Sequence, residues 1–458
     1  MPVQKPTKRY KTGKQYPDRE MKMTQGFSTR AIHAGAAPDP VSGSRAQPIH
    51  QTTSFVSRDA EHAANLFALQ EFGNIYTRLG NPTTGALEAR IADLEGGTMG
   101  VATASGHAAQ LLAFHVLMEP GANIVAARQL YGGSINQLSH AFKKFGWDVK
   151  FVNIDDVAAF EAAIDDKTRV IFTESLANPG GLVTDMKAIA AIAKRHGLPY
   201  MVDNTMASPY LCRPLEHGAN IIVESLTKFI GGHGNSIGGM IVDGGNFDWL
   251  AHKDKFPTMA SPQSYYNDMV FGEAFGALPL GPDGANVNIA FAIAARAFSL
   301  RDLGPAMSPM NAFLIMTGCE TLPLRMDRHC ANALKVAKHL QGHAKVSWVR
   351  YAGLEGDPHN GLAKTYLPKG AGAVFTFGLK GGHEAGVKLV EGVKLFSHLA
   401  NIGDTRSLII HPASTTHSQL TDAQKTAAGA APDTVRLSVG IEDAADIIAD
   451  LDQALAAL

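Results

Sequence analysis

Residues 223–234 read VESLTKFIGGHG, and this stretch decides the fold. An apolar run ending at Val223 gives way to two hydroxyl residues, a lysine and then glycines, as where a buried strand leaves a sheet. The hydroxyls of Ser225 and Thr227 and the nearby backbone N–H groups suit a phosphate, and the amine of Lys228 can act as a nucleophile. An ordinary strand exit with a solvated lysine has the same pattern, so the other strand exits must decide between the two.

Composition argues against several classes of protein. The chain has 458 residues, with 41 Lys and Arg against 42 Asp and Glu, so its net charge of −1 gives no overall attraction to nucleic acid or anionic membrane. Cys212, Cys319 and Cys330 are too scattered for a disulfide framework or a metal cage, so we expect a reducing cytoplasm and no metal site. No apolar run approaches the roughly 18 residues of a membrane span, and the N-terminus lacks an apolar signal core.

Apolar strands alternate with helices through the first two thirds of the chain. The pattern predicts strands at 101–104, 123–127, 148–152, 170–174, 199–202, 221–223 and 240–242, and helices at 81–95, 106–118, 135–145 and 186–196. Further strands are expected at 346–351, 372–379 and 407–410, and helices at 311–324, 326–340, 386–393 and 443–458. The first set predicts a mostly parallel α/β sheet covered on both faces, and the second an antiparallel sheet with covering helices.

Polar residues follow several of the predicted parallel strands, where ligands of such sheets bind. Residues 105–107 (SGH) open a helix whose free N–H groups attract an anion, although a plain N-cap serine has the same sequence. Tyr131, followed by two glycines, offers either a stacking face or a packed turn residue. Asn178 places an amide in a turn, and Asp203 offers a carboxylate that needs a partner if buried, or otherwise a turn or helix cap.

Together with Lys228, these exits match the requirements of pyridoxal phosphate. This cofactor needs a lysine amine for its Schiff base, a carboxylate beside its ring nitrogen and a phosphate site, and a ring to stack upon is common. The interval between Asp203 and Lys228 allows one crossover between neighbouring strands. A nucleotide-binding oxidoreductase fits less well, because Ile237 stands where the third glycine of G-x-G-x-x-G would fall.

Several motifs resemble those of the Cys/Met-metabolism group of pyridoxal-phosphate enzymes. They are residues 28–35 (STRAIHAG), 76–78 (YTR), 81–83 (NPT), 178–179 (NP), 202–205 (VDNT), 225–228 (SLTK), 411–414 (HPAS) and 436–442 (RLSVGIE). The resemblance implies fold type I, the aminotransferase-like α/β fold. It gives a large cofactor-binding domain at 81–315 with a mostly parallel sheet and a smaller α+β domain at 316–458. An extended N-terminal arm at 1–80 is expected, irregular over 27–55 and with a basic, disordered tail at 1–24.

The resemblance also implies how the cofactor is held. Lys228 would form the Schiff base and then move the substrate's α-proton, while Asp203 would pair with the ring nitrogen. Tyr131 would stack on the ring and assist the leaving group. Further cofactor contacts are expected from Ser105, Gly106, His107, Asn178, Ser225 and Thr227.

Substrate and subunit contacts follow from the same resemblance. Arg436 would bind the substrate carboxylate, assisted by Asn401 and Tyr131. Tyr76 and Arg78 would reach the phosphate bound to a neighbouring subunit, so we expect active sites shared within a dimer, and a homotetramer overall. Tyr76, Arg78 and Asn401 also suit plain interface or core positions.

Within the family, the chain most resembles the O-acetylhomoserine sulfhydrylases, in residues 401–412 (NIGDTRSLIIHP) and in the long segment at 244–322. This subgroup implies γ-replacement on O-acetyl-L-homoserine by sulfide or methanethiol, giving L-homocysteine or L-methionine and acetate. An O-succinylhomoserine sulfhydrylase or a cystathionine γ-synthase would keep the same cofactor residues, so both remain alternatives. A catalytically inactive, cofactor-free regulator is a third alternative, against which Lys228, Asp203 and Arg436 argue.

Overall fold

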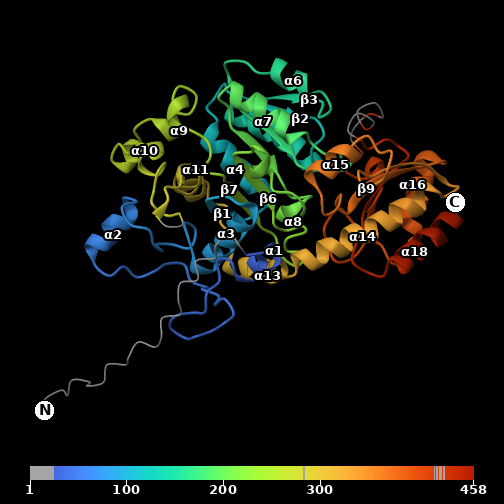
Figure 1. Cartoon of the computed structure of the whole chain (residues 1–458), viewed down its shortest axis with the longest axis horizontal. Helices are drawn as coiled ribbons and strands as arrows, with labels where there is room; N and C mark the ends of the chain where they lie inside the picture. Colours follow the sequence, from blue (N-terminus) through green and yellow to red (C-terminus); the bar gives the residue numbers. More distant parts are fainter. Residues whose placement is uncertain (1–24, 282–283, 417, 419–420, 422–424, 426–428) are drawn as a thin grey trace, which may run out of the picture.

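The computed structural model describes residues 25–281, 284–416, 418, 421, 425 and 429–458. The predicted basic tail at 1–24 lies outside the described residues. The chain forms two parts, each built on one β-sheet, and the long helix α14 (Leu322–Gln341) runs from one part into the other (Figure 1).

The larger sheet has seven strands in the order β1-β7-β6-β5-β4-β2-β3. They are β1 Met99–Thr103, β2 Asn123–Ala127, β3 Asp148–Val152, β4 Thr168–Glu174, β5 Tyr200–Asp203, β6 Ile221–Ser225 and β7 Gly239–Asp243. β7 is antiparallel to both of its neighbours, whereas the other pairs are parallel. All residues of β2 and β7 are buried, as in strands covered on both faces. The predicted mostly parallel α/β sheet is confirmed.

Capped helices connect these strands and cover the sheet. They are α3 Pro82–Glu95, α4 Gly106–Leu117, α6 Val157–Ala162 and α7 Met186–Arg195. α3 contacts β1 and β7, and α4 contacts β6, β7 and β1. Asn81, Ser105 and Asp185 each accept a backbone N–H from the first turn of the helix that follows, which fixes where these helices begin.

The helix predicted at 135–145 is not continuous. An α-helical turn, α5 (Gly132–Asn136), passes into a π-helical turn at Gln137–Ala141 and a 3₁₀ turn at Phe142–Phe145. The spacing of apolar residues predicts which face of a helix is buried, but not which carbonyl oxygen accepts each backbone N–H. Phe142, the first residue of the 3₁₀ turn, is buried and packs edge-on against Phe114 of α4, with ring centroids 5.3 Å apart.

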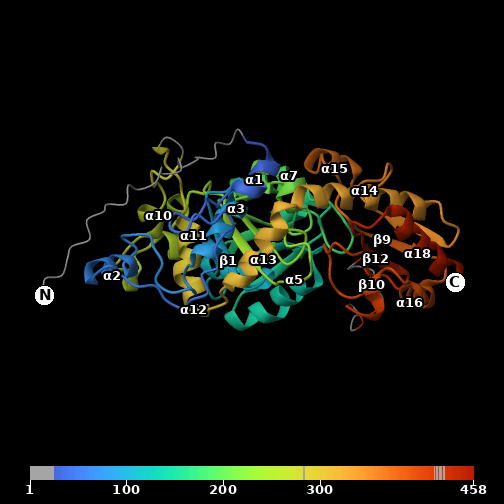
Figure 2. The same ribbon diagram turned by 90° about the horizontal axis from the view of Figure 1, so that it is seen from below.

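The N-terminal segment is more ordered than predicted. Residues 27–33, expected to be irregular, form helix α1 (Phe27–His33), which contacts α3 and α13. Arg30 is buried and pairs with Asp93 of α3 at 2.7 Å, which holds α1 against the large part. A second helix, α2 (Ala60–Phe67), lies at the end of the molecule opposite the smaller sheet (Figures 1 and 2).

The smaller sheet has the order β10-β11-β12-β9-β8. Its strands are β8 Val346–Arg350, β9 Val374–Leu379, β10 Ser397–His398, β11 Leu408–Ile410 and β12 Thr434–Ser438. All pairs are antiparallel except β10 with β11. The central strand, β12, was not predicted. Its helices are α15 Asn360–Tyr366, α16 Gly382–Gly392 and α18 Ala444–Ala456.

The long segment after β7 forms short helices before the second part. They are η4 Leu250–His252, α9 Pro257–Ala260, η5 Ser264–Tyr266, α10 Phe271–Ala274, α11 Ala290–Ala294, a π-turn at Ala295–Leu300, α12 Arg301–Leu303 and α13 Pro309–Glu320. Short helices also occur at Ser208–Leu211, Pro214–His217 and Pro412–Ser414. The domain boundaries remain a prediction, and the one at residues 315/316 falls within α13. Within the described ranges, none of the helices has the length and apolar character needed to cross a bilayer.

Candidate active site

The carboxyl ends of β4, β5 and β6 bring three predicted regions together. These parallel neighbours end at Glu174, Asp203 and Ser225, respectively. Because parallel strands end at the same edge of a sheet, the turns that carry Asn178 and Lys228 leave that edge side by side. The site therefore lies at the ends of strands that are almost wholly buried.

Lys228 lies in the turn after β6 and contacts a loop of the smaller part. Its Nζ donates a hydrogen bond to Oδ1 of Asn401 at 2.6 Å. Burial, together with the positive charge of Arg436, lowers the pKa of Lys228 to about 8. The amine is therefore much more readily deprotonated than an ordinary lysine.

Arg436 extends from the central strand β12 towards the same place. Its side chain is buried, and its two terminal nitrogens donate to Oδ1 of Asn178 and to the carbonyl oxygen of Asn401, each at 3.1 Å. Its Nε has no partner among the described residues, although it is also buried. Burial lowers the pKa of Arg436 to about 10. A buried guanidinium without a carboxylate partner in the described chain is suited to an anionic ligand.

Asp203 keeps a partly accessible face at the end of β5. Its Oδ2 accepts from Nε2 of Gln110 at 3.0 Å and its Oδ1 accepts from the backbone N–H of Thr205 at 2.9 Å. Burial of the carboxyl raises the pKa of Asp203, so the group would gain from a cationic partner. Gln110 was not predicted, since a glutamine inside a helix pattern carries no signal of its own.

Glu174 is a second residue that the sequence analysis missed. Its buried carboxylate accepts the backbone N–H of Tyr131 at 2.6 Å and that of Asn178 at 2.8 Å. Burial, and then the charge of Asp203, holds the pKa of Glu174 well above its ordinary value. One side chain thus fixes two loops of the site. Its place at the end of a predicted strand was the available signal.

The predicted phosphate residues meet at the start of α4. The hydroxyl of Ser105 accepts the N–H of Ala108 at 3.1 Å and so caps this helix, while its contact with the cofactor stays a prediction. A Cβ on Gly106 would lie 2.7 Å from Cβ of Ser225, so only glycine permits this close approach. The hydroxyl of Thr227 is bonded to the backbone of Gly238. These groups gather at a helix N-terminus, which favours an anion.

Tyr131 and His107 lie beside this helix start, and their rings meet edge to face with centroids 5.7 Å apart. Tyr131 is 46% exposed, so a face of its ring is available to a ligand. Tyr76 and Arg78, by contrast, show no side-chain hydrogen bond to the other predicted site residues among the described part of the chain. Arg78 lies over the Tyr76 ring at 5.4 Å, and in the part of the chain that the structure describes neither side chain has a hydrogen bond or ion pair with Lys228 or Arg436.

Comparison with known proteins adds to this geometry. The sequence profile of the family described as "Cys/Met metabolism PLP-dependent enzyme" matches residues 28–456. The chain is 53% identical to the O-acetyl-L-homoserine sulfhydrylase of Leptospira meyeri over 429 residues, covering 93% of this chain and 96% of that protein. It is 48% identical to O-acetyl-L-homoserine sulfhydrylase 1 of Thermus thermophilus, covering 94% of this chain and 100% of that protein.

A solved structure is also similar. It is the crystal structure of a proposed O-acetylhomoserine (thiol)-lyase from Campylobacter jejuni, which contains N'-pyridoxyl-lysine-5'-monophosphate. The TM-score is 0.89 at 37% sequence identity, with 94% of this chain and 100% of that chain covered.

Proposed function

The chain belongs to the Cys/Met metabolism PLP-dependent enzyme family, and from this premise we propose that it is a transferase that uses O-acetyl-L-homoserine. Sulfide or methanethiol would replace acetate at the γ-carbon, giving L-homocysteine or L-methionine. The observation that carries the proposal is the half-buried amine of Lys228, hydrogen-bonded to the same residue, Asn401, that accepts from Arg436. The sulfhydrylases to which the chain is similar over most of its length support the choice of substrate.

The residues present fit pyridoxal phosphate. Asp203 has no cationic partner among the described side chains, and a protonated ring nitrogen would provide one. The N–H groups of Gly106 and His107, at the first turn of α4, have no acceptor within the helix and suit the phosphate, as do Ser225 and Thr227. Lys228 would hold the cofactor, Tyr131 would stack on it and Asn178 would bond to it. When bound, the cofactor withdraws electrons from the carbon atoms next to the substrate's amino group.

Lys228 would move the protons. A base that removes a proton from the substrate's α-carbon must be neutral, and the lowered pKa of Lys228 makes the neutral amine available near neutral pH. The same amine, once protonated, can return the proton at the end of the reaction. Its hydrogen bond to Asn401 would keep the amine oriented between these steps.

Arg436 would orient the substrate. Its guanidinium can bind the substrate carboxylate, and its bonds to Asn178 and Asn401 fix the plane of that group. A carboxylate held there and an amino group near Lys228 would leave the γ-carbon free to lose acetate and bond to sulfur. Tyr131, whose ring is exposed, would assist the leaving group.

Tyr76 and Arg78 are proposed to complete the phosphate site of a neighbouring subunit. The packing of Arg78 over the Tyr76 ring and the 41% exposure of Tyr76 support this assignment. The proposal therefore includes a homodimer as the smallest active unit, and a homotetramer composed of two such dimers. We also propose a cytoplasmic location, because the three buried, unpaired cysteines suit a reducing compartment.

Purified protein tests the proposal. We expect absorbance of the bound cofactor and turnover of O-acetyl-L-homoserine with sulfide, both lost in Lys228→Ala. An active Lys228→Ala variant without that absorbance would refute the assignment. Preference for O-succinyl-L-homoserine, or for cysteine as the thiol, would instead support the two alternatives within the family. Sedimentation of the wild type and of Arg78→Ala, with the activity of each, tests the shared site.

A further inference from the structure

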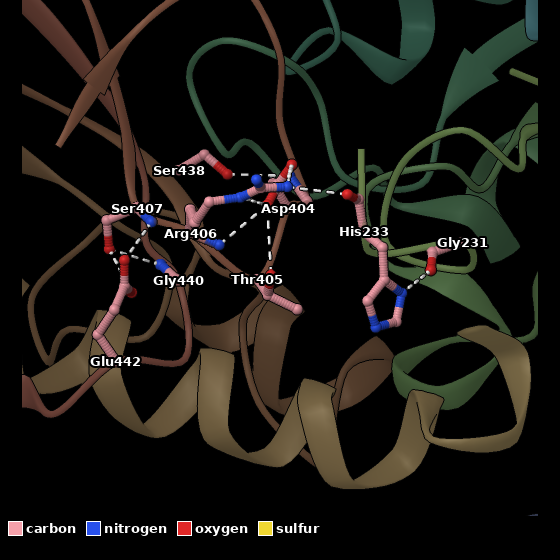
Figure 3. Close-up of polar contacts among 10 residues, drawn as sticks. Gly231, His233, Asp404, Thr405, Arg406, Ser407, Ser438, Gly440 and Glu442 are labelled. Carbon is pink, nitrogen blue, oxygen red and sulfur yellow. Dashed lines mark hydrogen bonds and ion pairs between the residues drawn. The ribbon is translucent and has the colours of Figure 1, made fainter. Parts of the chain in front are cut away.

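The loop at residues 401–407, from the smaller part, lies across the loop that follows Lys228 in the larger part (Figure 3). Nη2 of Arg406 donates to the carbonyl oxygen of His233 at 2.8 Å. The backbone N–H of Thr405 donates to the carbonyl oxygen of Gly232 at 2.9 Å. These two bonds join segments that are far apart in the sequence and that belong to different sheets.

Asp404 holds Arg406 in the geometry that this contact needs. Its Oδ1 accepts from Nε of Arg406 at 2.7 Å and its Oδ2 accepts from Nη2 at 3.1 Å, a side-on, two-point pair. Burial acts to raise the pKa of Asp404, but the hydrogen bonds from Arg406 hold it below its ordinary value. Asp404 is buried, whereas the Arg406 side chain is 61% exposed. A Cβ on Gly234 would lie 2.3 Å from Oδ2 of Asp404, so the opposing loop needs glycine there.

The other side of the 401–407 loop is fixed to its own part of the protein. Ser407 donates from its N–H and its hydroxyl to the carboxylate of Glu442, at 2.6 and 2.9 Å. The N–H of Gly403 donates to the hydroxyl of Ser438, at the end of β12, at 2.9 Å (Figure 3). β12 is also the strand that carries Arg436. The 401–407 loop is thus held from both sides: by β12, the strand that carries Arg436, and by the loop that follows Lys228.

Asn401 begins this loop and touches both functional groups. Its side-chain oxygen accepts from Lys228 and its backbone oxygen accepts from Arg436. Movement of the loop would therefore alter the lysine and the guanidinium together.

We propose that Asp404 and Arg406 form a clasp between the two parts of the protein, and that they are positioning residues for the reaction. The clasp sets the place of Asn401, and so the spacing between the amine of Lys228 and the carboxylate-binding guanidinium of Arg436. The inference rests on the proposed function, since it assigns a purpose to the spacing between those two groups. It adds two residues that touch neither the cofactor nor the substrate.

The test uses the cofactor-loaded enzyme and Arg406→Ala. Because a displaced Arg436 would bind and align the substrate carboxylate less well, we expect KM for the amino-acid ester to rise on the order of ten-fold or more. The change in KM for sulfide should be smaller. The absorbance of the bound cofactor should keep its intensity while its pH dependence shifts, because the loop also carries the backbone oxygen that holds Arg436, whose charge acts on Lys228. Arg406→Lys keeps a charge for Asp404 and should restore part of the ester KM.

Arg195→Ala is the matched control. Arg195 is also an exposed arginine in a two-point pair with a carboxylate, that of Glu161, but it lies on α7. It should leave both KM values and the pH dependence as in the wild type. Arg406→Ala kinetics equal to those of Arg195→Ala, or a loss of activity that only follows the loss of folded protein, would overturn the clasp. In either case the Lys228→Ala variant tests the proposed function separately. An inactive variant would still support that function, whereas an active variant would refute it.

Discussion

The lowered pKa of Lys228 makes a prediction about how the protein captures its cofactor. Only the neutral amine can attack an aldehyde, so the rate at which cofactor-free protein is loaded with pyridoxal phosphate should follow the deprotonated fraction of Lys228. We expect the loading rate to rise with pH and to level off above a midpoint near 8, the pKa set by burial and by Arg436.

The magnitude follows from the shift of the pKa from 10.5 to about 8. At pH 7 about one amine in ten would be neutral, against about one in three thousand for an ordinary lysine, a gain of roughly 300-fold in reactive amine. The same shift corresponds to roughly 3 kcal/mol against the charged form. Because the unfolded chain binds this proton more tightly, the cofactor-free protein should also become more stable as pH rises from about 8 to about 10.5.

Stopped-flow absorbance after mixing cofactor-free protein with pyridoxal phosphate measures the rate across this pH range. Asn401→Asp places a carboxylate where Oδ1 lies 2.6 Å from the Lys228 amine, so it should move the midpoint upward by favouring the ammonium form. Asn401→Ala removes the same contact without adding charge and should leave the midpoint near 8. A wild-type midpoint close to 10.5, or one that Asn401→Asp does not move, would refute the reasoning.

Three further changes test other features of the site. Asp203→Asn should keep the fold by circular dichroism but lower turnover on the order of 10²-fold, since the charge facing the proposed ring nitrogen is lost; wild-type turnover would contradict this. Gly106→Ala should weaken cofactor affinity, measured by equilibrium dialysis, because its Cβ would meet Ser225 at 2.7 Å. Burial raises the pKa of Glu95 and of Glu224, two fully buried carboxyls that lie close to each other. The folded protein therefore keeps protons that the unfolded chain loses above about pH 4.5, and its stability should fall as pH rises from there. Urea unfolding should show a smaller fall in Glu95→Gln, and an equal fall would exclude this origin.

The larger sheet could be predicted because its strands are continuous apolar runs between turn residues. β2 and β3 begin and end where the sequence predicts, at 123–127 and 148–152. β12 could not be predicted in this way, because Arg436 interrupts its short apolar pattern and resembles a solvated loop residue. That arginine is buried only because oxygens of Asn178 and Asn401 meet it, and these lie 258 and 35 residues away in the sequence.

Contacts between residues far apart in the sequence also explain which site residues could be predicted. Lys228 and Asp203 follow predicted strands, so the topology of a parallel sheet was enough to place them at one edge. Glu174 ends a neighbouring strand and offered the same signal, but its task is to accept two backbone N–H groups, which no side-chain motif records. The contact made by Arg406 is harder still to anticipate, because its partner is the backbone carbonyl oxygen of His233, in a loop of the other part of the protein. Side chains that bind a ligand can be matched to chemistry, whereas those that hold a backbone become visible only when the backbone is placed. The positioning of this site therefore depends on residues that the sequence alone does not distinguish from exposed polar residues or helix caps.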